Sequence, residues 1–311
     1  MESDPAMNPA RALIQRCSRR SSLYDRVRPR LFDVSLRDGI QNASPEKYTT
    51  EYKKQIFHRI MEEECPSSIE IGSLVSPKVL PIMSDSLEMY DYVKHYLETT
   101  EPYSATKVYL LIPSFAKLGM ALHHGITHFS FITSVSEKFQ QKNTRKTLAE
   151  TKDELGRIRE TLAMIPAKSR QKLYVSCVNR CPIIGRIDND FIVHELLHYH
   201  TAYAFDEICL SDTCGTLTYD DFEYVADTIL HFGVPASKLS LHLHVNDSNR
   251  NEVSQIVRYC LSKRITRFDV SMLTTGGCSV TMSEGNCLPN MTYDLFYELL
   301  LKHLDAETQS P

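Results

Sequence analysis

Residues 241–246 read LHLHVN, which places two histidines one residue apart on an apolar background. Successive side chains of a β-strand point to opposite faces, so His242 and His244 would share one face of a strand. Such a pair has two ordinary explanations. Each imidazole either makes a hydrogen bond inside the protein core or supplies a nitrogen ligand to a metal ion.

Oxygen donors elsewhere in the chain could complete a metal site with the two histidines. Asp38 offers a carboxylate, and Asn286 offers an amide carbonyl. Two imidazole nitrogens with two oxygens and open positions suit a divalent ion in an octahedral shell, so Mg²⁺ or Mn²⁺ is expected before Zn²⁺.

The rest of the chain alternates short β-rich runs with longer amphipathic ones, and these elements would hold the site residues in place. Eight runs rich in branched and aromatic residues predict buried strands over 31–36, 68–71, 107–112, 127–132, 172–178, 205–210, 239–245 and 266–272. Helical patterns predict helices over 50–64, 77–98, 115–125, 145–165, 189–203, 218–233, 250–263 and 291–304.

Eight strand-helix units of this length predict an α/β fold, a (β/α)8 TIM barrel, over residues 31–304. A doubly wound open sheet has the same alternation of strands and helices, so it is the alternative fold. Residues 1–30 are expected to form a tail before the barrel, and residues 305–311 a short tail after it.

Enzymes with this fold carry their chemistry at the carboxyl ends of the barrel strands. Polar and reactive groups gather at those ends here, and the helices carry few of them. The segments in question are RDG at 37–39, Glu70, CVNRCP at 177–182, SDTCG at 211–215, HLH at 242–244 and TTGGC at 274–278. We therefore expect the active site at this end of the barrel.

Composition makes several classes of function improbable. The formal net charge is −4, the isoelectric point is about 6.3, and no basic run is interleaved with aromatic residues, so nucleic acid is not an expected partner. No apolar run approaches the ~18 residues of a membrane span, so no membrane partner is expected either. Nine scattered cysteines predict free thiols in a reducing compartment.

The first 30 residues are rich in arginine and serine and contain no lysine. A mitochondrial presequence has this composition, although the acidic residues Glu2, Asp4 and Asp25 are less typical of one. A disordered tail is the alternative. The cytoplasm and the mitochondrial matrix are therefore the two expected locations.

Several motifs resemble the 3-hydroxy-3-methylglutaryl-CoA lyase family of metal-dependent (β/α)8 enzymes. DVSLRDGIQN at 33–42 resembles the signature of these metallolyases and the related synthases. VSPKVLPIMSD at 75–85 and YVSCVNRCPIIGRI at 174–187 resemble the lyase branch more than the condensing enzymes. The similarity extends over residues 31–304, and it implies cleavage of 3-hydroxy-3-methylglutaryl-CoA, or of a close analogue, to acetyl-CoA and acetoacetate.

The resemblance also implies roles for the site residues. The ligands of Mg²⁺ or Mn²⁺ would be Asp38, His242, His244 and Asn286. An acyl-CoA would be the substrate, and a homodimer is possible in such a family.

Four further residues would act on the substrate. Arg37 would stabilise the enolate that forms at the thioester, and Glu70 would orient Arg37. Asp212 would assist proton transfer at the substrate hydroxyl, and Cys278 would be the catalytic thiol, a general acid or base. Each has a plainer explanation: a surface ion pair for Arg37, a local hydrogen bond for Glu70, a helix cap for Asp212 and an inert apolar thiol for Cys278.

Some segments depart from the family pattern. HLHVNDSN stands where the family usually has HCHDTYG, IPS at 112–114 replaces TPN, and the loop after GGC is shorter and contains Glu284. These changes lie beside the expected site. Two alternatives to an active lyase are therefore a catalytically weak or inactive homologue that binds metal or acyl-CoA, and a Claisen-condensing synthase of the same superfamily.

Overall fold

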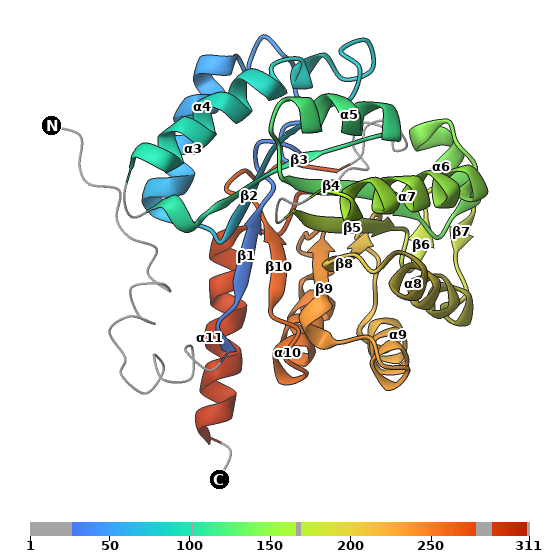
Figure 1. The fold of residues 1–311 in the computed structure, drawn as a ribbon. Helices are drawn as coiled ribbons and strands as arrows, with labels where there is room; N and C mark the ends of the chain where they lie inside the picture. The colour runs from blue at the N-terminus through green and yellow to red at the C-terminus, as the bar shows by residue number, and fades with distance from the viewer. Residues whose placement is uncertain (1–26, 101–102, 166–168, 278–287, 310–311) are drawn as a thin grey trace, which may run out of the picture.

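The computed structural model describes residues 27–100, 103–165, 169–277 and 288–309. Its centre is a barrel of eight parallel strands in the order β1, β10, β9, β8, β5, β4, β3, β2 (Figure 1). β1 pairs with both β10 and β2, so the sheet closes on itself. Closure confirms the predicted (β/α)8 barrel and excludes a doubly wound open sheet.

The barrel strands match the predicted runs to within three residues at each end. They are β1 (Arg30–Asp33), β2 (Ser68–Ser73), β3 (Lys107–Leu111), β4 (His128–Ser134), β5 (Arg170–Ser176), β8 (Glu207–Asp212), β9 (Leu239–Leu243) and β10 (Arg267–Val270). A short antiparallel hairpin, β6 (Arg180–Cys181) and β7 (Gly185–Arg186), lies in the connection after β5 and was not predicted.

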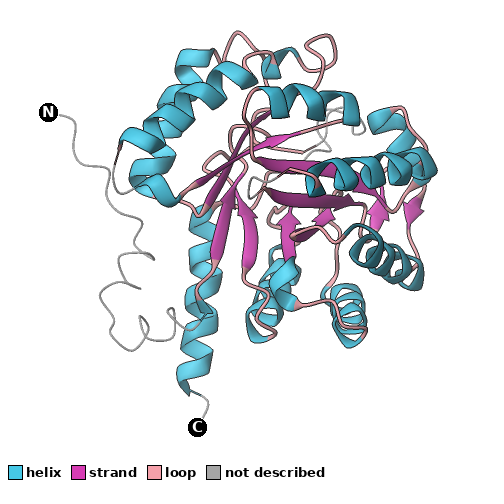
Figure 2. Cartoon of the chain, viewed as in Figure 1, coloured by secondary structure: helices cyan, strands magenta, loops and turns pink. Residues whose placement is uncertain are grey.

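Helices surround the barrel (Figure 2). They are α3 (Thr50–Glu63), α4 (Ser86–Thr99), α5 (Phe115–His123), α6 (Glu137–Thr144), α7 (Leu148–Ala163), α8 (Asn189–Tyr203), α9 (Tyr219–His231), α10 (Arg250–Ser262) and α11 (Tyr293–Gln309). Three short 3-10 helices are η1 (Pro81–Met83), η2 (Tyr103–Ala105) and η3 (Ala236–Lys238). Among the described residues, no helix is both long enough and apolar enough to cross a membrane.

Side-chain caps explain where several helices begin. Thr147 accepts a hydrogen bond from the backbone N–H of Glu150, whose carboxylate accepts one from the backbone of Thr147, which forms a capping box before α7. The side chains of Asp188 and Thr218 likewise accept a backbone N–H at the starts of α8 and α9. Caps of this kind each contribute about 1 kcal/mol to helix stability.

The helices of the structure differ from the prediction in three places. The helix predicted over 77–98 is divided into η1 and α4, because Pro81 has no N–H and interrupts an α-helix. α6 was not predicted, since it is mostly polar and buries only Phe139 and Gln140. α11 continues to Gln309, five residues beyond the predicted barrel boundary at residue 304.

The interior of the barrel is unusually polar for a protein core. Apolar groups such as Phe32 and Tyr109 pack there. Between them lie fully buried charged groups, among them Glu70, Lys172 and Asp269. Charged side chains are rarely buried unless they are paired, so this interior is organised around ion pairs.

Asp33, at the end of β1, joins the last helix to the barrel. Its carboxylate accepts hydrogen bonds from the hydroxyl of Tyr293 on α11 at 2.9 Å and from the backbone and hydroxyl of Ser35, both at 2.9 Å. Burial raises the pKa of Asp33 to about 7, although these hydrogen bonds act to lower it.

The raised pKa of Asp33 predicts a pH-dependent stability. The folded protein holds this proton up to about pH 7, whereas the unfolded chain releases it near the ordinary value of 3.8. The contribution of Asp33 to stability is therefore lost as the pH rises through this window. Asparagine does not titrate, so the Asp33→Asn variant should not lose this stability. Between about pH 4 and pH 7 its free energy of unfolding should therefore rise, relative to that of the wild type, by up to about 1.4 kcal/mol per pH unit. Urea denaturation at pH 4.5, 5.5 and 6.5 measures the difference, and a constant difference would contradict the prediction.

Candidate active site

A cavity of about 380 Å³ opens at the carboxyl ends of the barrel strands. One part of its lining is polar and includes Arg37, Asp38, Tyr174, His242 and His244. These residues come from the loop after β1, from β5 and from the end of β9. The RDG and HLH segments, far apart in the sequence, therefore meet at one cavity.

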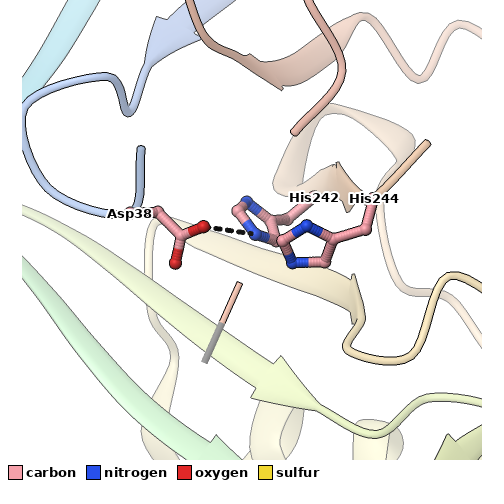
Figure 3. A group of neighbouring side chains, drawn as sticks. All are labelled: Asp38, His242 and His244. Carbon is pink, nitrogen blue, oxygen red and sulfur yellow. Dashed lines mark ion pairs between the residues drawn. The ribbon is translucent and has the colours of Figure 1, made fainter. Parts of the chain in front are cut away.

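Asp38, His242 and His244 form a buried cluster that could hold a metal ion (Figure 3). One possible ligand atom from each residue lies within 4.8 Å of the others, and within the described residues no other group of three or more His, Cys, Asp or Glu meets this criterion. Nε2 of His242 is 3.8 Å from Oδ2 of Asp38, and the two imidazole rings are 4.9 Å apart. We name these three residues the metal cluster.

The charge state of the metal cluster suits a cation. Burial acts to raise the pKa of Asp38, but the charges of Arg37, His242 and His244 outweigh it and hold the pKa well below its ordinary value. Burial, followed by the neighbouring His242, lowers the pKa of His244 to about 4. At neutral pH the cluster therefore offers a carboxylate and, at His244, a neutral imidazole, which are the forms that bind metals.

Unpaired polar atoms around the metal cluster also fit a cation. Nδ1 of His244 and Oδ1 of Asn290 are buried and have no hydrogen-bond partner within the described chain. Asn290 forms an isolated β-bridge with His244. A Cβ atom added to Gly276 would lie 2.4 Å from Nδ2 of Asn290 and 3.2 Å from Oδ2 of Asp38, so only glycine allows this close packing. Buried polar groups without partners are rare, and a bound ion is one explanation for them.

The two ring nitrogens of His242 have different surroundings. Its Nδ1 lies 3.1 Å from Oδ2 of Asp269, which is a hydrogen bond inside the core. Its Nε2 faces Asp38. One ring therefore makes a core hydrogen bond through one nitrogen and leaves the other for the metal cluster.

Arg37 is held between two carboxylates beside the metal cluster. Nε donates to Oε2 of Glu70 at 2.5 Å, and a terminal nitrogen donates to Oδ1 of Asp38 at 2.6 Å. The guanidinium carbon lies 5.0 Å from the centre of the Tyr174 ring, and the Tyr174 hydroxyl donates to Glu70 at 3.2 Å. The side chains of Arg37 and Glu70 are 8% and 0% exposed, which excludes a surface ion pair. The guanidinium plane is fixed at the cavity lining.

Residues 28–250 match the family described as HMGL-like. The chain belongs to the HMGL-like family. The match includes the complete metal cluster and Arg37, and it confirms the resemblance seen in the motifs.

Curated relatives agree with this HMGL-like assignment. The chain is 28% identical over 280 residues to hydroxymethylglutaryl-CoA lyase YngG of Bacillus subtilis (strain 168), a match that covers 89% of this chain and 86% of the relative. It is 29% identical over 253 residues to the 3-hydroxy-3-isohexenylglutaryl-CoA/hydroxy-methylglutaryl-CoA lyase of Pseudomonas aeruginosa, with 80% and 78% covered. The human cytoplasmic 3-hydroxy-3-methylglutaryl-CoA lyase is 28% identical, with 87% and 68% covered.

Solved structures show the same fold. The HMG-CoA lyase of Brucella melitensis superimposes with a TM-score of 0.71 at 22% identity, over 91% of this chain and 99% of that one. The HMG-CoA lyase of Acinetobacter baumannii, in complex with coenzyme A and 3-methylmalate, gives 0.71 at 22% identity, over 91% and 85%. At this level of identity the likeness supports the barrel fold alone.

Asp212 lies at the end of β8, but its carboxylate serves the following turn. Oδ1 accepts the backbone N–H of Thr216 at 3.1 Å, and Oδ2 accepts that of Leu217 at 3.0 Å. Its neighbours Ser211 and Thr213 line the cavity, and Asp212 does not. Burial raises its pKa to about 6, although backbone N–H groups act to lower it. This placement corresponds to the capping alternative and not to proton transfer on a substrate.

Two predicted site residues, Cys278 and Asn286, lie outside the described residues. The glycine before Cys278 is described, and its backbone N–H donates to Oδ2 of Asp38 at 3.1 Å. The side chains of Gln41 and Asn42 donate to the carbonyl of Gly277 at 2.8 and 2.6 Å. The GGC segment is therefore anchored to the RDG loop up to Gly277. The six cysteines in the described part of the chain are free.

Sequence reasoning missed three residues at the site. Asn290 stands just before α11 and has no motif of its own, so only its bridge to His244 reveals it. Lys172 and Asp269 gave a weak signal, because each is a charged residue inside a run predicted as a buried strand.

The remaining lining of the cavity is largely apolar. It comes from the segments after β2 and β3, from β4 and from α6, and it includes Leu74, Val75, Val79, Leu80, Met83, Pro113, Ile132 and Phe139. Two cations, Lys117 and Arg145, also line the cavity. The cavity can therefore receive a ligand with an apolar portion and negative charge.

Proposed function

We propose that this protein is a divalent-metal-dependent carbon–carbon lyase that cleaves 3-hydroxy-3-methylglutaryl-CoA, or a close analogue, to acetyl-CoA and acetoacetate. The observation that carries the proposal is the meeting of the metal cluster and Arg37 at one cavity of an HMGL-like barrel. The names of the curated relatives support the same reaction.

The metal in the proposal is Mg²⁺ or Mn²⁺, held by Asp38, His242 and His244. An asparagine oxygen would add a fourth ligand, either from Asn286, which the motif resemblance implies, or from Asn290, whose buried Oδ1 has no partner among the described residues. When bound, the metal would supply a Lewis acid that polarises the tertiary hydroxyl of the substrate and favours loss of its proton.

Arg37 would stabilise the negative charge that develops on the thioester oxygen as the carbon–carbon bond breaks. A guanidinium already held in place needs no reorganisation during the reaction, and the cavity strengthens its field by limiting access of water. Glu70 and Tyr174 would act by fixing Arg37, since both contact it directly. Cys278 would give or take the proton at the reacting carbon, and Asp212 is given no direct part.

A specific observation also favours a substrate with a larger apolar branch. The apolar residues that line the cavity could contact an apolar branch larger than methyl. The relative from Pseudomonas aeruginosa is named for both an isohexenyl and a methyl substrate. An isohexenyl-type branch at carbon 3 is therefore our second candidate.

The test measures acetoacetate and acetyl-CoA after incubation of metal-free protein with 3-hydroxy-3-methylglutaryl-CoA, with and without Mn²⁺. Equal amounts of both products are expected only with metal, and Cys278→Ala should lower the rate by about 10² to 10⁴-fold. The matched control is Cys65→Ala, which changes an exposed thiol. The isohexenyl analogue is assayed in parallel. If neither substrate yields product while metal is bound, the proposal fails and a non-catalytic homologue or a synthase takes its place.

A further inference from the structure

Lys172 on β5 is buried inside the barrel, with its side chain only 1% exposed. Lysine is almost never fully buried unless it is paired, because removal of its ammonium group from water is costly. It lies below the cavity and is not part of the cavity lining. The contacts of Lys172 inside the barrel must therefore offset the cost of burying its ammonium group.

The ammonium group of Lys172 is surrounded by partners. It donates a hydrogen bond to Oδ1 of Asp269 and lies 3.2 Å from Oε1 of Glu207. It also lies 3.8 Å from the centre of the Phe32 ring and 4.7 Å from that of Tyr174. Aromatic faces attract cations most strongly where water is excluded. The nitrogen is therefore held from several sides.

Asp269 connects Lys172 to the metal cluster. Its two carboxylate oxygens have different partners: Oδ1 binds Lys172, and Oδ2 lies 3.1 Å from Nδ1 of His242. Because a carboxylate is planar, the position of the Lys172 ammonium also sets the direction in which Oδ2 points. The hydrogen bond at Nδ1 in turn decides which nitrogen of His242 carries the proton and which faces Asp38.

We propose that Lys172 is a positioning residue for the metal cluster: by holding Oδ1 of Asp269, it aligns Oδ2 with Nδ1 of His242 and leaves Nε2 free to bind the metal. This inference rests on the metal site of the proposed function, but it does not depend on which substrate is cleaved. A lysine that served packing alone would affect stability and leave metal affinity unchanged.

The chain offers a matched control for that difference. Lys53 on α3 is also buried, at 3% exposure, and pairs with Asp85 at 2.6 Å. Asp85 has no contact with the metal cluster in the described structure. Lys53→Met therefore removes a buried lysine from an ion pair that does not reach His242.

The experiment measures the Kd of Mn²⁺ for metal-free protein by electron paramagnetic resonance. Lys172→Met should weaken binding about 10- to 100-fold, as is usual when the partner of a ligating histidine is disturbed. Lys172→Arg should recover most of the affinity, and Lys53→Met should keep the wild-type Kd. A folded Lys172→Met variant with wild-type Kd would overturn the proposal.

A second measurement reads the wild-type protein, so its result does not depend on the folding of Lys172→Met. In metal-free wild type labelled with ¹⁵N-histidine, His242 should carry its proton on Nδ1, with the signal assigned by its loss in His242→Gln. A proton on Nε2 would overturn the proposal. If wild type binds Mn²⁺ and Lys172→Met binds it weakly while no acyl-CoA is cleaved, the positioning role stands and the proposed lyase function fails.

Discussion

The His244→Ala variant is expected to lose Mn²⁺ binding and to release acetoacetate at least about a thousandfold more slowly than wild type. In the proposed site His244 would contribute one of three buried ligands, and burial keeps its imidazole neutral, with a pKa of about 4. Lewis-acid stabilisation of several kcal/mol would be lost with the ion, and about 4 kcal/mol corresponds to about a thousandfold in rate.

The control for this variant is His194→Asn, which changes a histidine that is 77% exposed on α8. Both variants are titrated with Mn²⁺ and assayed for acetoacetate. A His244→Ala protein with wild-type turnover and full metal dependence would refute the ligand assignment. The same titration of Asn286→Ala and Asn290→Ala shows which asparagine is the fourth ligand, since only that substitution should weaken binding.

The Arg37→Met variant is expected to lose both activity and stability, for separable reasons. Removal of a fixed charge that faces a developing oxyanion lowers the rate by about 10² to 10³-fold. Glu70, whose side chain is 0% exposed, would be left without its cation, and breaking a buried ion pair typically costs about 3–5 kcal/mol. Urea denaturation and the acetoacetate assay measure the two losses independently.

A double variant separates the two losses. Arg37→Met with Glu70→Gln removes the uncompensated charge, and the amide can still accept the hydrogen bond from Tyr174. We expect most of the stability to return and the activity to stay low. The control is Arg59→Met, which breaks an exposed ion pair with Glu63 on α3. It should change the free energy of unfolding by less than about 1 kcal/mol. Recovery of activity in the double variant would contradict the assignment of Arg37.

Much of the fold follows from local patterns in the sequence. Each barrel strand is a short apolar run, and the alternation in LHLHVN places both histidines on the same face, as the structure shows. The parallel strands and connecting helices then bring the strand ends to one side of the barrel. For this reason the RDG loop and the HLH segment could be predicted to meet.

The register between strands could not be predicted, and it explains the placement of Asp212. In the pairing of β8 with β9, Ser211 is opposite His242 and Asp212 is opposite Leu243. Ser211 therefore shares the inward face of His242, whereas Asp212 is on the other face. A motif such as SDTCG shows which residues are reactive, but it does not show which of two adjacent residues faces the cavity.

Contacts across the barrel were equally hidden. β5 and β10 are separated in the sheet by β8 and β9, so Lys172 and Asp269 meet only through the interior. Asn290 reaches His244 because the segment before α11 crosses the end of β9. Local sequence patterns indicate which residues are neighbours within one helix or strand. They do not indicate contacts between residues that are far apart in the sequence, such as these.

The most direct test of the central claim measures bound Mn²⁺ and acetoacetate release on the same samples of protein during a titration from the metal-free state. The proposed function predicts that both quantities rise together and saturate at one ion per chain. Full activity without bound metal, or one tightly bound ion per chain with no cleavage of either candidate substrate, would contradict it.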